Sequence, residues 1–385
     1  MKKYAGKPHL LKEINLSLIQ QIIKEKGPIS KPDIASHSKL SLPTVNKNVE
    51  YLLECKVIIL SGTKKSGLGR KPNLYEINIQ TEYILAIYFK NDFLYGSVCN
   101  MLGNIQDKNK VKINFSSKNT ILENIFKLID SFVNYNKNIK AIGLAVPGVV
   151  KKDGSIYNIP NITGWEGINI KKILQEKYKL DAFIDNDVNL ETIGIYHNHF
   201  VKKYRNIVCL YFGMGVGAGV IIDKKLYRGA SNFAGEISYM LTRNVEDKEL
   251  FDFKSKGLME EDITRIIDEI ICQAGNGDTS YSLTKIFEDK TGTFENKIEE
   301  LTKKISFLII NITCILNPEI IVLDGIFICE KFISMLKVKI NKYIDEKNQP
   351  ELVLVNDENA KIFGMVNLCL SGINSNFCLI DQKEV

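Results

Sequence analysis

The sequence predicts an α/β protein in two parts, a small helical module followed by a larger body of strands and helices. Three observations indicate this division. Residues 1–80 hold 14 Lys and Arg against 6 Asp and Glu, whereas the remainder holds 37 against 39. Helical patterns crowd the first 54 residues, and from residue 81 onward short apolar strands are interspersed with amphipathic helices. A basic module attached to a near-neutral body indicates nucleic-acid binding.

Length and composition exclude several classes of protein. At 385 residues the chain exceeds one average domain, and a hydrophobic content of 45% is enough for real cores. No apolar run reaches the roughly 18 residues of a membrane span, and no signal peptide opens the chain. The eight cysteines show no CxxC or CxC spacing, so we interpret them as reduced core thiols. We therefore expect a cytoplasmic protein without membrane contact.

Three helical patterns make up the N-terminal module. The first covers residues 9–26 and ends at Gly27-Pro28, because proline disfavours a helical conformation in the residue before it. Ser30 then caps a short helix, with Asp33 three residues later. A turn at residues 39–41 leads into a third helix with proline in its first turn. The sequence thus predicts three helices joined by short turns.

The third helix has a buried face and a polar face. The predicted buried positions are Val45, Val49, Leu52 and Leu53, and the positions predicted to point away are Thr44, Asn46, Lys47 and Asn48. Three helices of these lengths are typical of a helix-turn-helix, whose third helix enters the major groove of DNA. We therefore predict DNA contacts for Ser41, Thr44, Asn46 and Lys47.

A strand, a basic glycine-rich loop and a second strand follow and predict a wing. Residues 57–60 and 73–77 flank the segment SGTKKSGLGRKP. The cations of this loop suit phosphates or the minor groove; they are Lys64, Lys65, Arg70 and Lys71. Residues 1–80 are therefore predicted to be a winged helix-turn-helix that binds double-stranded DNA. The alternative is a small helical domain with a solvated basic loop.

The body carries a glycine-rich hairpin within residues 211–240. A strand at 207–212 precedes four alternating glycines, a second strand covers 220–222, and residues 223–225 turn the chain. Glycine lets another group approach the backbone closely, so we expect this hairpin to lie tightly against something. A bent hairpin without function is the alternative. The other expected strands are 84–89, 93–99, 141–146, 183–184 and 319–323, and the expected helices are 119–134, 190–196, 260–273, 295–316 and 359–378.

Eight segments, in order along nearly the whole chain, resemble the ROK family (repressor, open reading frame, kinase), specifically its transcriptional repressor branch. They include SGLGRKPNLYEIN, IGLAVPGVV, NIPNITGWEGINI, IDNDVNLETIG, FGMGVGAGVIIDKKLYRGASNFAGEIS and LNPEIIVLDG. The resemblance implies an actin/hexokinase-like two-lobed fold at 81–385 behind the winged module. Lobe one would comprise 81–190 and 360–385, and lobe two 191–359. A monosaccharide would bind between the lobes.

The resemblance also implies a sugar site. Asn186 and Asp187 match the Asn-Asp pair of the family, Glu236 matches its second sugar carboxylate, and Gly148 matches the backbone loop beside the sugar. Asn161 is a further candidate. Carboxylates and amides at fixed positions suit sugar hydroxyls, which both donate and accept hydrogen bonds. A helix N-cap is the alternative role for Asp187, and a solvated turn is the alternative for Glu236.

The sequence lacks the phosphate-binding residues of the family's kinases. Tyr88 stands at the Asp of the first phosphate loop, Lys90 and Asn91 stand at its two glycines, and Asp92 stands at its Thr. In the second loop, Met214 replaces the usual Thr. Phosphate binding needs unobstructed backbone N–H groups, and phosphoryl transfer depends on positioning and charge around the phosphate. We therefore expect no ATP cofactor and no enzymatic activity.

The zinc site of many family members is also missing. Those members follow the Glu with Gly-His and a Cys-rich segment, whereas this chain has Ile237, Ser238 and Tyr239, and residues 241–262 contain no Cys or His. Structural zinc needs about four nitrogen or sulfur ligands. Tyr239 is a candidate to donate its hydroxyl to the sugar. His197-Asn198-His199 does not place both histidines on one helical face, so we interpret it as surface and expect no metal.

Together these observations predict a sugar-responsive transcriptional repressor of carbohydrate metabolism genes, acting as a homodimer or homotetramer. Its partners would be a DNA operator and a monosaccharide effector; xylose and N-acetylglucosamine-type ligands both occur among relatives of the family. An ATP-dependent sugar kinase with an accessory DNA-binding domain is the alternative. A constitutive DNA-binding protein with a vestigial pocket is a third possibility.

Overall fold

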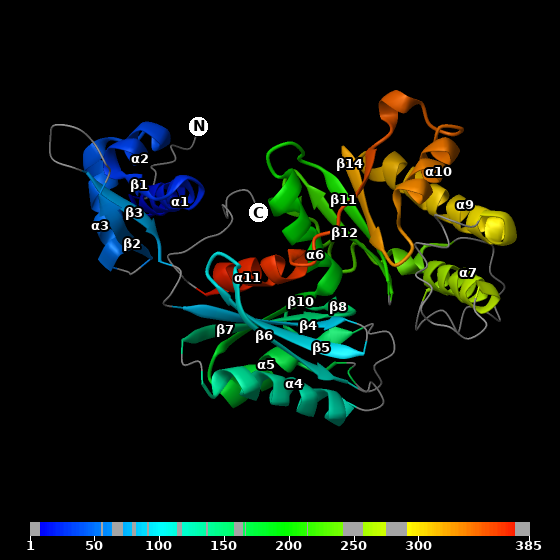
Figure 1. Ribbon diagram of the computed structural model, residues 1–385, viewed down its shortest axis with the longest axis horizontal. Coiled ribbons are helices and arrows are strands. Elements are labelled where there is room, and N and C mark those ends of the chain that lie inside the picture. The colour runs from blue at the N-terminus through cyan, green and yellow to red at the C-terminus, as the bar shows by residue number, and fades with distance from the viewer. Residues whose placement is uncertain are drawn as a thin grey trace.

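The computed structural model describes residues 8–54, 57–63, 72–78, 82–90, 92–113, 118–135, 138–157, 165, 167–213, 215–241, 257–274 and 291–373. Figure 1 shows three parts, a small module here called the head (residues 8–78) to one side of two larger lobes. Among the described residues, no helix combines the length and apolarity needed to cross a membrane.

The head contains three helices and a three-stranded sheet. Its elements are α1 (Pro8–Lys26), β1 (Ile29–Ser30), α2 (Lys31–Ser38), α3 (Leu42–Glu54), β2 (Ile58–Thr63) and β3 (Asn73–Ile77), with strand order β1-β3-β2. Ser30 caps α2 as predicted, since its Oγ accepts from the backbone N–H of Asp33 at 3.3 Å. The prediction for Asn48 was wrong. This residue is buried beside Val49, where its side-chain amide can donate to the Thr44 carbonyl oxygen at 2.8 Å.

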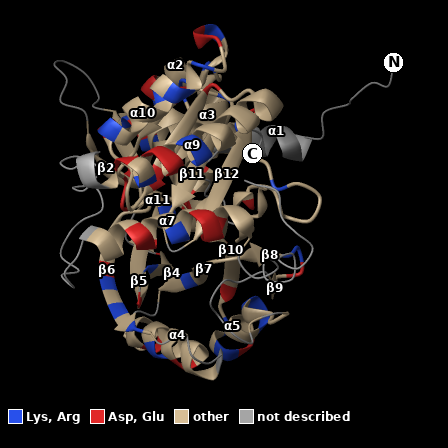
Figure 2. Ribbon diagram, turned by 90° about the vertical axis from the view of Figure 1, so that its right-hand side faces the viewer, with Lys and Arg blue, Asp and Glu red and all other residues tan. Residues whose placement is uncertain are grey.

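Lobe one is built on a five-stranded sheet of order β10-β7-β4-β5-β6. Its strands are β4 (Tyr83–Lys90), β5 (Phe93–Asn100), β6 (Ile105–Lys112), β7 (Ile139–Val146) and β10 (Asp181–Asn186). The first three are antiparallel, and β7 and β10 run parallel to β4. Helices α4 (Lys118–Val133) and α5 (Ile170–Tyr178) cover one face, and a hairpin of β8 (Val149–Val150) and β9 (Ile156–Tyr157) follows β7. The lysines along edge strand β6 (Figure 2) discourage pairing with another chain.

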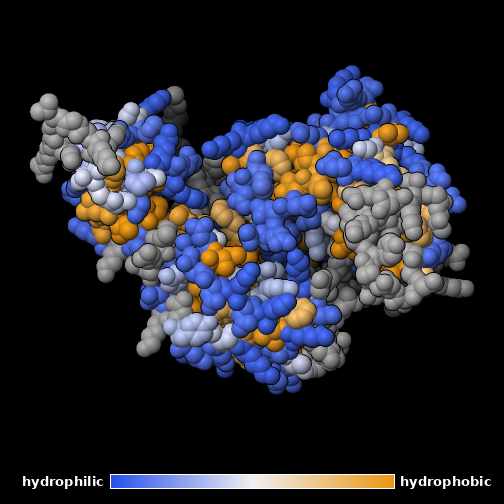
Figure 3. Space-filling model, viewed as in Figure 1, coloured by the Kyte–Doolittle hydropathy of each residue, from blue (hydrophilic) through white to orange (hydrophobic). Residues whose placement is uncertain are grey.

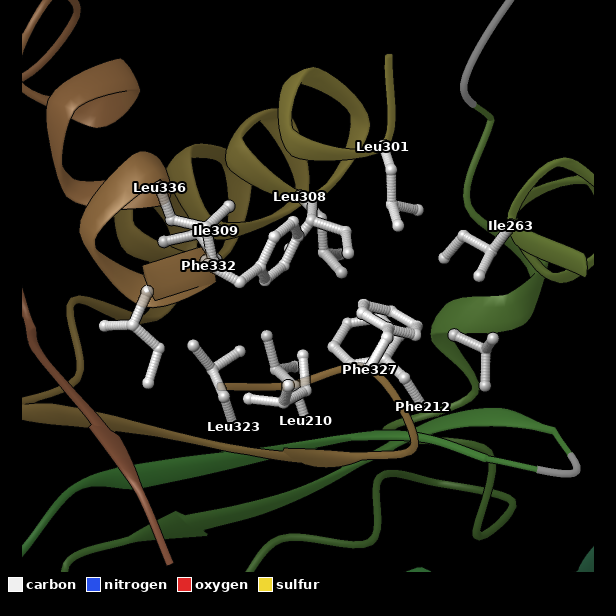
Figure 4. Close-up of a cluster of buried hydrophobic side chains, with 14 of the residues drawn as sticks. Leu210, Phe212, Ile263, Leu301, Leu308, Ile309, Leu323, Phe327, Phe332 and Leu336 are labelled. Carbon is white, nitrogen blue, oxygen red and sulfur yellow. The ribbon is translucent and has the colours of Figure 1, made fainter. Parts of the chain in front are cut away.

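Lobe two has a second five-stranded sheet, of order β13-β12-β11-β14-β15. Its strands are β11 (Ile207–Phe212), β12 (Val216–Ile222), β13 (Lys225–Leu226), β14 (Ile320–Gly325) and β15 (Glu351–Leu354). Helices α7 (Leu258–Ala274), α9 (Thr291–Leu316) and α10 (Glu330–Ile340) cover one face. In Figure 4, side chains of β11 and β14 such as Leu210 and Leu323 point toward Leu308 on α9 and Phe332 on α10. This apolar layer holds the sheet rigid behind the glycine hairpin.

Two helices cross between the sheets. Helix α6 (Asp187–Ile195) follows the last strand of lobe one and continues into a π-helical turn, η1 (Tyr196–Phe200); α11 (Ala360–Gly372) follows the last strand of lobe two. They meet at two glycines, because a Cβ on Gly194 would lie 1.9 Å from the Ala360 carbonyl oxygen and one on Gly364 would lie 2.0 Å from that of Leu190. The expected lobe boundary at residue 190 falls inside α6.

The head packs on the body through α1. Its buried residues are contiguous with those between α11 and the sheet of lobe one. The Lys24 ammonium lies 5.6 Å from the centre of the Phe363 ring of α11. His197 of η1 lies near Lys24, and burial, with a smaller effect of that cation, lowers the pKa of His197 to about 4. The head therefore contacts both crossing helices.

Candidate functional site

A cleft of about 650 Å³ lies between the two lobes. Both sheets and both crossing helices contribute to it: the end of β4, the start of α6, the hairpin of β11 and β12, and the loop before α11. Clefts of this size are typical of small-molecule sites. The structure brings Gly148, Asn186, Asp187, Glu236 and Tyr239 together in its lining.

Asn186 and Asp187 are positioned by the junction of β10 and α6. The Asn186 side chain caps α6 by accepting from the Asn189 N–H at 3.0 Å, and its amide donates to the Gly148 carbonyl oxygen at 2.9 Å. Asn186 therefore takes the N-cap role that was the alternative for Asp187. One oxygen of Asp187 accepts from the Val188 N–H at 2.9 Å, and the other lies 3.7 Å from the Lys361 ammonium.

The glycine hairpin fixes α6 against lobe two. A Cβ on Gly219 of β12 would lie 1.9 Å from the Thr192 hydroxyl oxygen, so no larger residue fits while α6 stays in place. The sequence prediction that the hairpin lies against another group is confirmed, and that group is α6. Because Asp187 opens the same helix, this contact sets the depth at which its carboxylate enters the cleft.

Glu236 and Tyr239 reach the cleft from a loop of lobe two that is tied to lobe one. The Arg228 guanidinium forms a two-pronged ion pair with Asp185 of β10, with one N–O distance of 2.8 Å. The Asn232 amide donates to the Val150 carbonyl oxygen at 2.7 Å, and the Tyr157 hydroxyl donates to the Ser231 carbonyl oxygen at 3.1 Å. These three contacts are called the clasp, and they hold the two lobes together on one side of the cleft.

Among the charged residues of the cleft that were not predicted are Lys361 and Glu191. Lys361, at the start of α11, lies 3.7 Å from Asp187 and 3.3 Å from Glu191. Burial alone would lower the pKa of Lys361, but the two carboxylates beside it raise that pKa above its usual value. Burial raises the pKa of both Asp187 and Glu191, while Lys361 opposes the rise. Glu191 could have been found, since it stands four residues after Asp187 on one helical face; no local pattern marks Lys361.

Two tyrosines supply neutral polar groups. Burial raises the pKa of Tyr88, and burial also raises the pKa of Tyr211 to about 12. Both phenols thus stay protonated at physiological pH and can donate hydrogen bonds. Together with carboxylates that accept them, these donors suit a polyhydroxylated ligand.

The remaining predicted residues fall into two groups. Lys47 of α3 and Ser41, the residue just before α3, are exposed, whereas Thr44 and Asn46 of α3 are half-buried; the Ser41 hydroxyl is 2.8 Å from that of Thr44. Outside the described residues lie Asn91, Asn161 and Met214, and the basic loop residues Lys64, Lys65, Arg70 and Lys71.

The segment 197–199 is only partly at the surface. Asn198 and His199 are exposed, and both bond to Asp357 of the cleft-lining loop, at 2.9 and 3.0 Å. His197 is instead half-buried next to the Tyr196 ring, because η1 packs under the head; for this residue the surface prediction was wrong. Within the described ranges, no group of His, Cys, Asp and Glu side chains could hold a metal ion.

Comparison with known proteins agrees with this geometry. The model of the ROK family matches residues 92–370. The chain belongs to the ROK family. This ROK chain is 28% identical over 360 residues to the xylose repressor of Caldicellulosiruptor bescii, covering 88% of the chain and 90% of that protein.

Solved structures share the fold. A ROK family transcriptional regulator, a homologue of the E. coli MLC protein, superposes with a TM-score of 0.72 at 19% identity, covering 92% of this chain and 95% of that one. A ROK family glucokinase from Streptomyces griseus, in complex with glucose and AMPPNP, superposes with a TM-score of 0.60 at 17% identity, covering 75% of this chain and all of that one. The ROK fold is therefore common to a regulator and an enzyme, and at these identities the likeness shows the fold alone.

Proposed function

We propose that this ROK protein is a sugar-responsive transcriptional repressor with a monosaccharide effector bound in the cleft. The likeness to a xylose repressor over most of both chains supports this assignment. We place the sugar against Asp187 and Glu236, with Gly148, Asn186, Tyr239 and Asn161 as further contacts. Lobe one is taken as 81–190 with 360–385, and lobe two as 191–359.

The head is proposed to be a winged helix-turn-helix. Helices α2 and α3 are joined by a short turn, and the hairpin of β2 and β3 follows. Placed in a major groove, α3 would present Thr44, Asn46 and Lys47 to DNA together with Ser41 just before the helix, with the basic loop of the hairpin on the phosphates. Leu42, 44% exposed, is suited to a thymine methyl group, and Figure 3 displays an apolar area over α3 and β2.

One observation carries the proposed link between sugar and DNA: helix α11 contacts both the cleft and the head. Lys361 of α11 pairs with Asp187 in the cleft, and Phe363, two residues later, lies under Lys24 of the head. A sugar that displaces Lys361 or changes the lobe angle shifts α11 and with it the head. In a homodimer or homotetramer this changes the spacing of two heads on half-sites about one or more helical turns apart. The sugar acts through its different affinity for the two arrangements.

The test is DNA binding to the chain's own upstream region, at fixed salt, with and without a panel of monosaccharides. We expect one sugar to change the DNA affinity at least tenfold, about 1.4 kcal/mol of coupling. Asp187→Asn should abolish this response while DNA binding without sugar is kept, because Glu191 at 3.3 Å still holds Lys361 in place. Phe363→Leu should keep sugar binding and weaken the response. A response that survives Asp187→Asn would disprove the assignment of the cleft.

We further propose that the protein is not a kinase. Tyr88 and Lys90 line the cleft at the end of the first hairpin, where a phosphate would need open backbone. A coupled assay should therefore detect no sugar-dependent ATP hydrolysis. Turnover above about 1 s⁻¹, within the usual range of enzymes, would restore the alternative of a sugar kinase with a DNA-binding domain.

A further inference from the structure

We infer that Glu260 closes the cleft to phosphate groups, so that the effector is an uncharged sugar rather than a sugar phosphate or a nucleotide. The inference rests on the proposed function and names the ligand class of the same cleft. It is carried by one buried carboxylate, the backbone that this carboxylate contacts, and the charge of the surrounding lining.

Glu260 lies in the first turn of α7 and is only 6% exposed. Its Oε2 accepts a hydrogen bond from the backbone N–H of Val216 at 3.3 Å. The same oxygen lies 3.6 Å from the position that a Cβ on Gly215 would take. The carboxylate therefore rests directly on the backbone of the glycine loop, on the side that lines the cleft.

Without such a carboxylate, a glycine-rich loop of this kind can bind a phosphate group. Backbone N–H groups that no side chain covers bind phosphate oxygens in many glycine-rich loops. Here a carboxylate oxygen already accepts from one of them. An incoming phosphate would have to displace this buried carboxylate or lie beside it, and two like charges at about 4 Å repel by several kcal/mol at an effective dielectric of 20.

The described part of the lining gives a phosphate little compensation. Besides Glu260, six of its residues are Asp or Glu and two are Lys. Lys361 is engaged by Asp187 and Glu191, at 3.7 and 3.3 Å, so its charge balances the protein's own carboxylates. Lys90, at the end of β4, is exposed. An anion in this cleft would thus be desolvated among like charges.

An uncharged sugar is not repelled by these carboxylates and can form hydrogen bonds with them. Each hydroxyl can donate to a carboxylate and accept from a phenol, and Tyr88 and Tyr211 both stay protonated. A site built for hydroxyl groups gains from each one that it pairs. Selection against charge therefore comes from Glu260 together with the carboxylates that would hold the sugar.

The experiment is calorimetric titration of the full-length protein with D-xylose, D-glucose, N-acetyl-D-glucosamine, the 6-phosphates of the two hexose sugars, inorganic phosphate and Mg-ATP. We expect the sugar that binds to do so at least tenfold more tightly than any of the phosphates. Glu260→Gln removes the charge but keeps an oxygen that can accept from Val216, so the fold is retained. This variant should bind inorganic phosphate at least tenfold more tightly than the wild type.

Glu261→Gln is the matched control, because Glu261 is the next residue on α7, is exposed and does not line the cleft. It should leave every affinity unchanged. A sugar phosphate or Mg-ATP that binds the wild type as tightly as the best sugar would overturn the inference and leave the repressor assignment standing. Unchanged phosphate affinity in Glu260→Gln would overturn the role of Glu260. If no sugar binds, the proposed function fails, and the inference fails with it.

Discussion

The two lobes have the same architecture but line the cleft in opposite ways. In each sheet, three antiparallel strands are followed by two parallel ones, and a crossing helix leaves the last strand. The first hairpin of lobe one presents side chains to the cleft, among them Tyr88 and Lys90. The first hairpin of lobe two presents backbone at Gly215 and Gly217.

The difference shows how one topology serves two purposes. In lobe two, the missing side chains let α6 approach β12, and the exposed backbone is covered by Glu260. In lobe one, Tyr88 and Lys90 stand at the end of the first hairpin, where we propose that they obstruct a nucleotide phosphate. A repeated fold therefore does not imply a repeated function, because each function depends on which residues occupy equivalent positions.

The largest expected effect comes from opening the clasp, which joins the lobes on one side of the cleft. Arg228→Met would leave Asp185, 4% exposed, without its cation. Breaking a buried ion pair costs about 3–5 kcal/mol; because a third of the Arg228 side chain is exposed, we expect about 3 kcal/mol of lost unfolding free energy in urea. Arg205→Met is the control, since its pair with Asp223 is exposed and should be worth under about 1 kcal/mol. If both variants lost the same unfolding free energy, the Arg228–Asp185 pair would contribute no more to stability than an exposed ion pair.

A smaller loss of stability should distinguish β12 from β5, the second strands of the two sheets. Gly219→Ala on β12 would place a Cβ 1.9 Å from Thr192 of α6, whereas Gly96→Ala on β5 would place one 2.7 Å from the edge of the Phe132 ring of α4. We expect about 2 kcal/mol of destabilisation for the first and about 1 kcal/mol for the second, as for overpacked cores. Only Gly219→Ala should also weaken sugar binding, because only α6 carries Asp187. Thr192→Ala should rescue it; the lack of rescue would contradict the close-packing explanation.

The smallest expected effect is a pH-dependent change in stability at His197. This residue lies in η1, the continuation of crossing helix α6 under the head. The folded-state pKa of His197 is about 4, below its usual 6.5, so its stabilising contribution is present above pH 6.5 and is lost as the pH falls toward 4. The full shift corresponds to about 3 kcal/mol, and partial exposure reduces this to about 1 kcal/mol. Urea unfolding at pH 7 and at pH 4.5 should show the wild type losing this much more than His197→Gln. If both proteins lost the same unfolding free energy between pH 7 and pH 4.5, burial of His197 at the contact with the head would not contribute to stability.

Elements with clear periodicity were predicted well. Strand β11 and helices α4 and α7 lie within two residues of their expected positions, because alternating or helical spacing of apolar residues records burial directly. Strand β6 was not predicted, since an exposed edge strand such as IQDKNKVK has no apolar face. Asn48 was assigned to the wrong face because a buried amide is invisible to a pattern of apolar residues.

The site was only partly predictable. Asn186, Asp187 and Glu236 were identified through resemblance to a family, and the structure places them in one cleft. In the sequence, Lys361, Arg228 and Glu260 cannot be told apart from ordinary charged surface residues. Their partners lie far away in sequence, so their roles follow from tertiary packing that no local pattern records.

The place of α11 has a consequence for the order of synthesis. This helix covers the inner face of the lobe-one sheet, where Met365 and Cys369 lie against Gly143, and it supplies the Phe363 surface on which the head rests. Protein domains usually fold while the chain emerges from the ribosome, N-terminal domains first. Lobe one cannot follow that order, because its last layer is made after all of lobe two. The head therefore reaches its docked position only when translation of the body is nearly complete, and the proposed sugar-regulated contact with DNA would have to wait until the cleft exists.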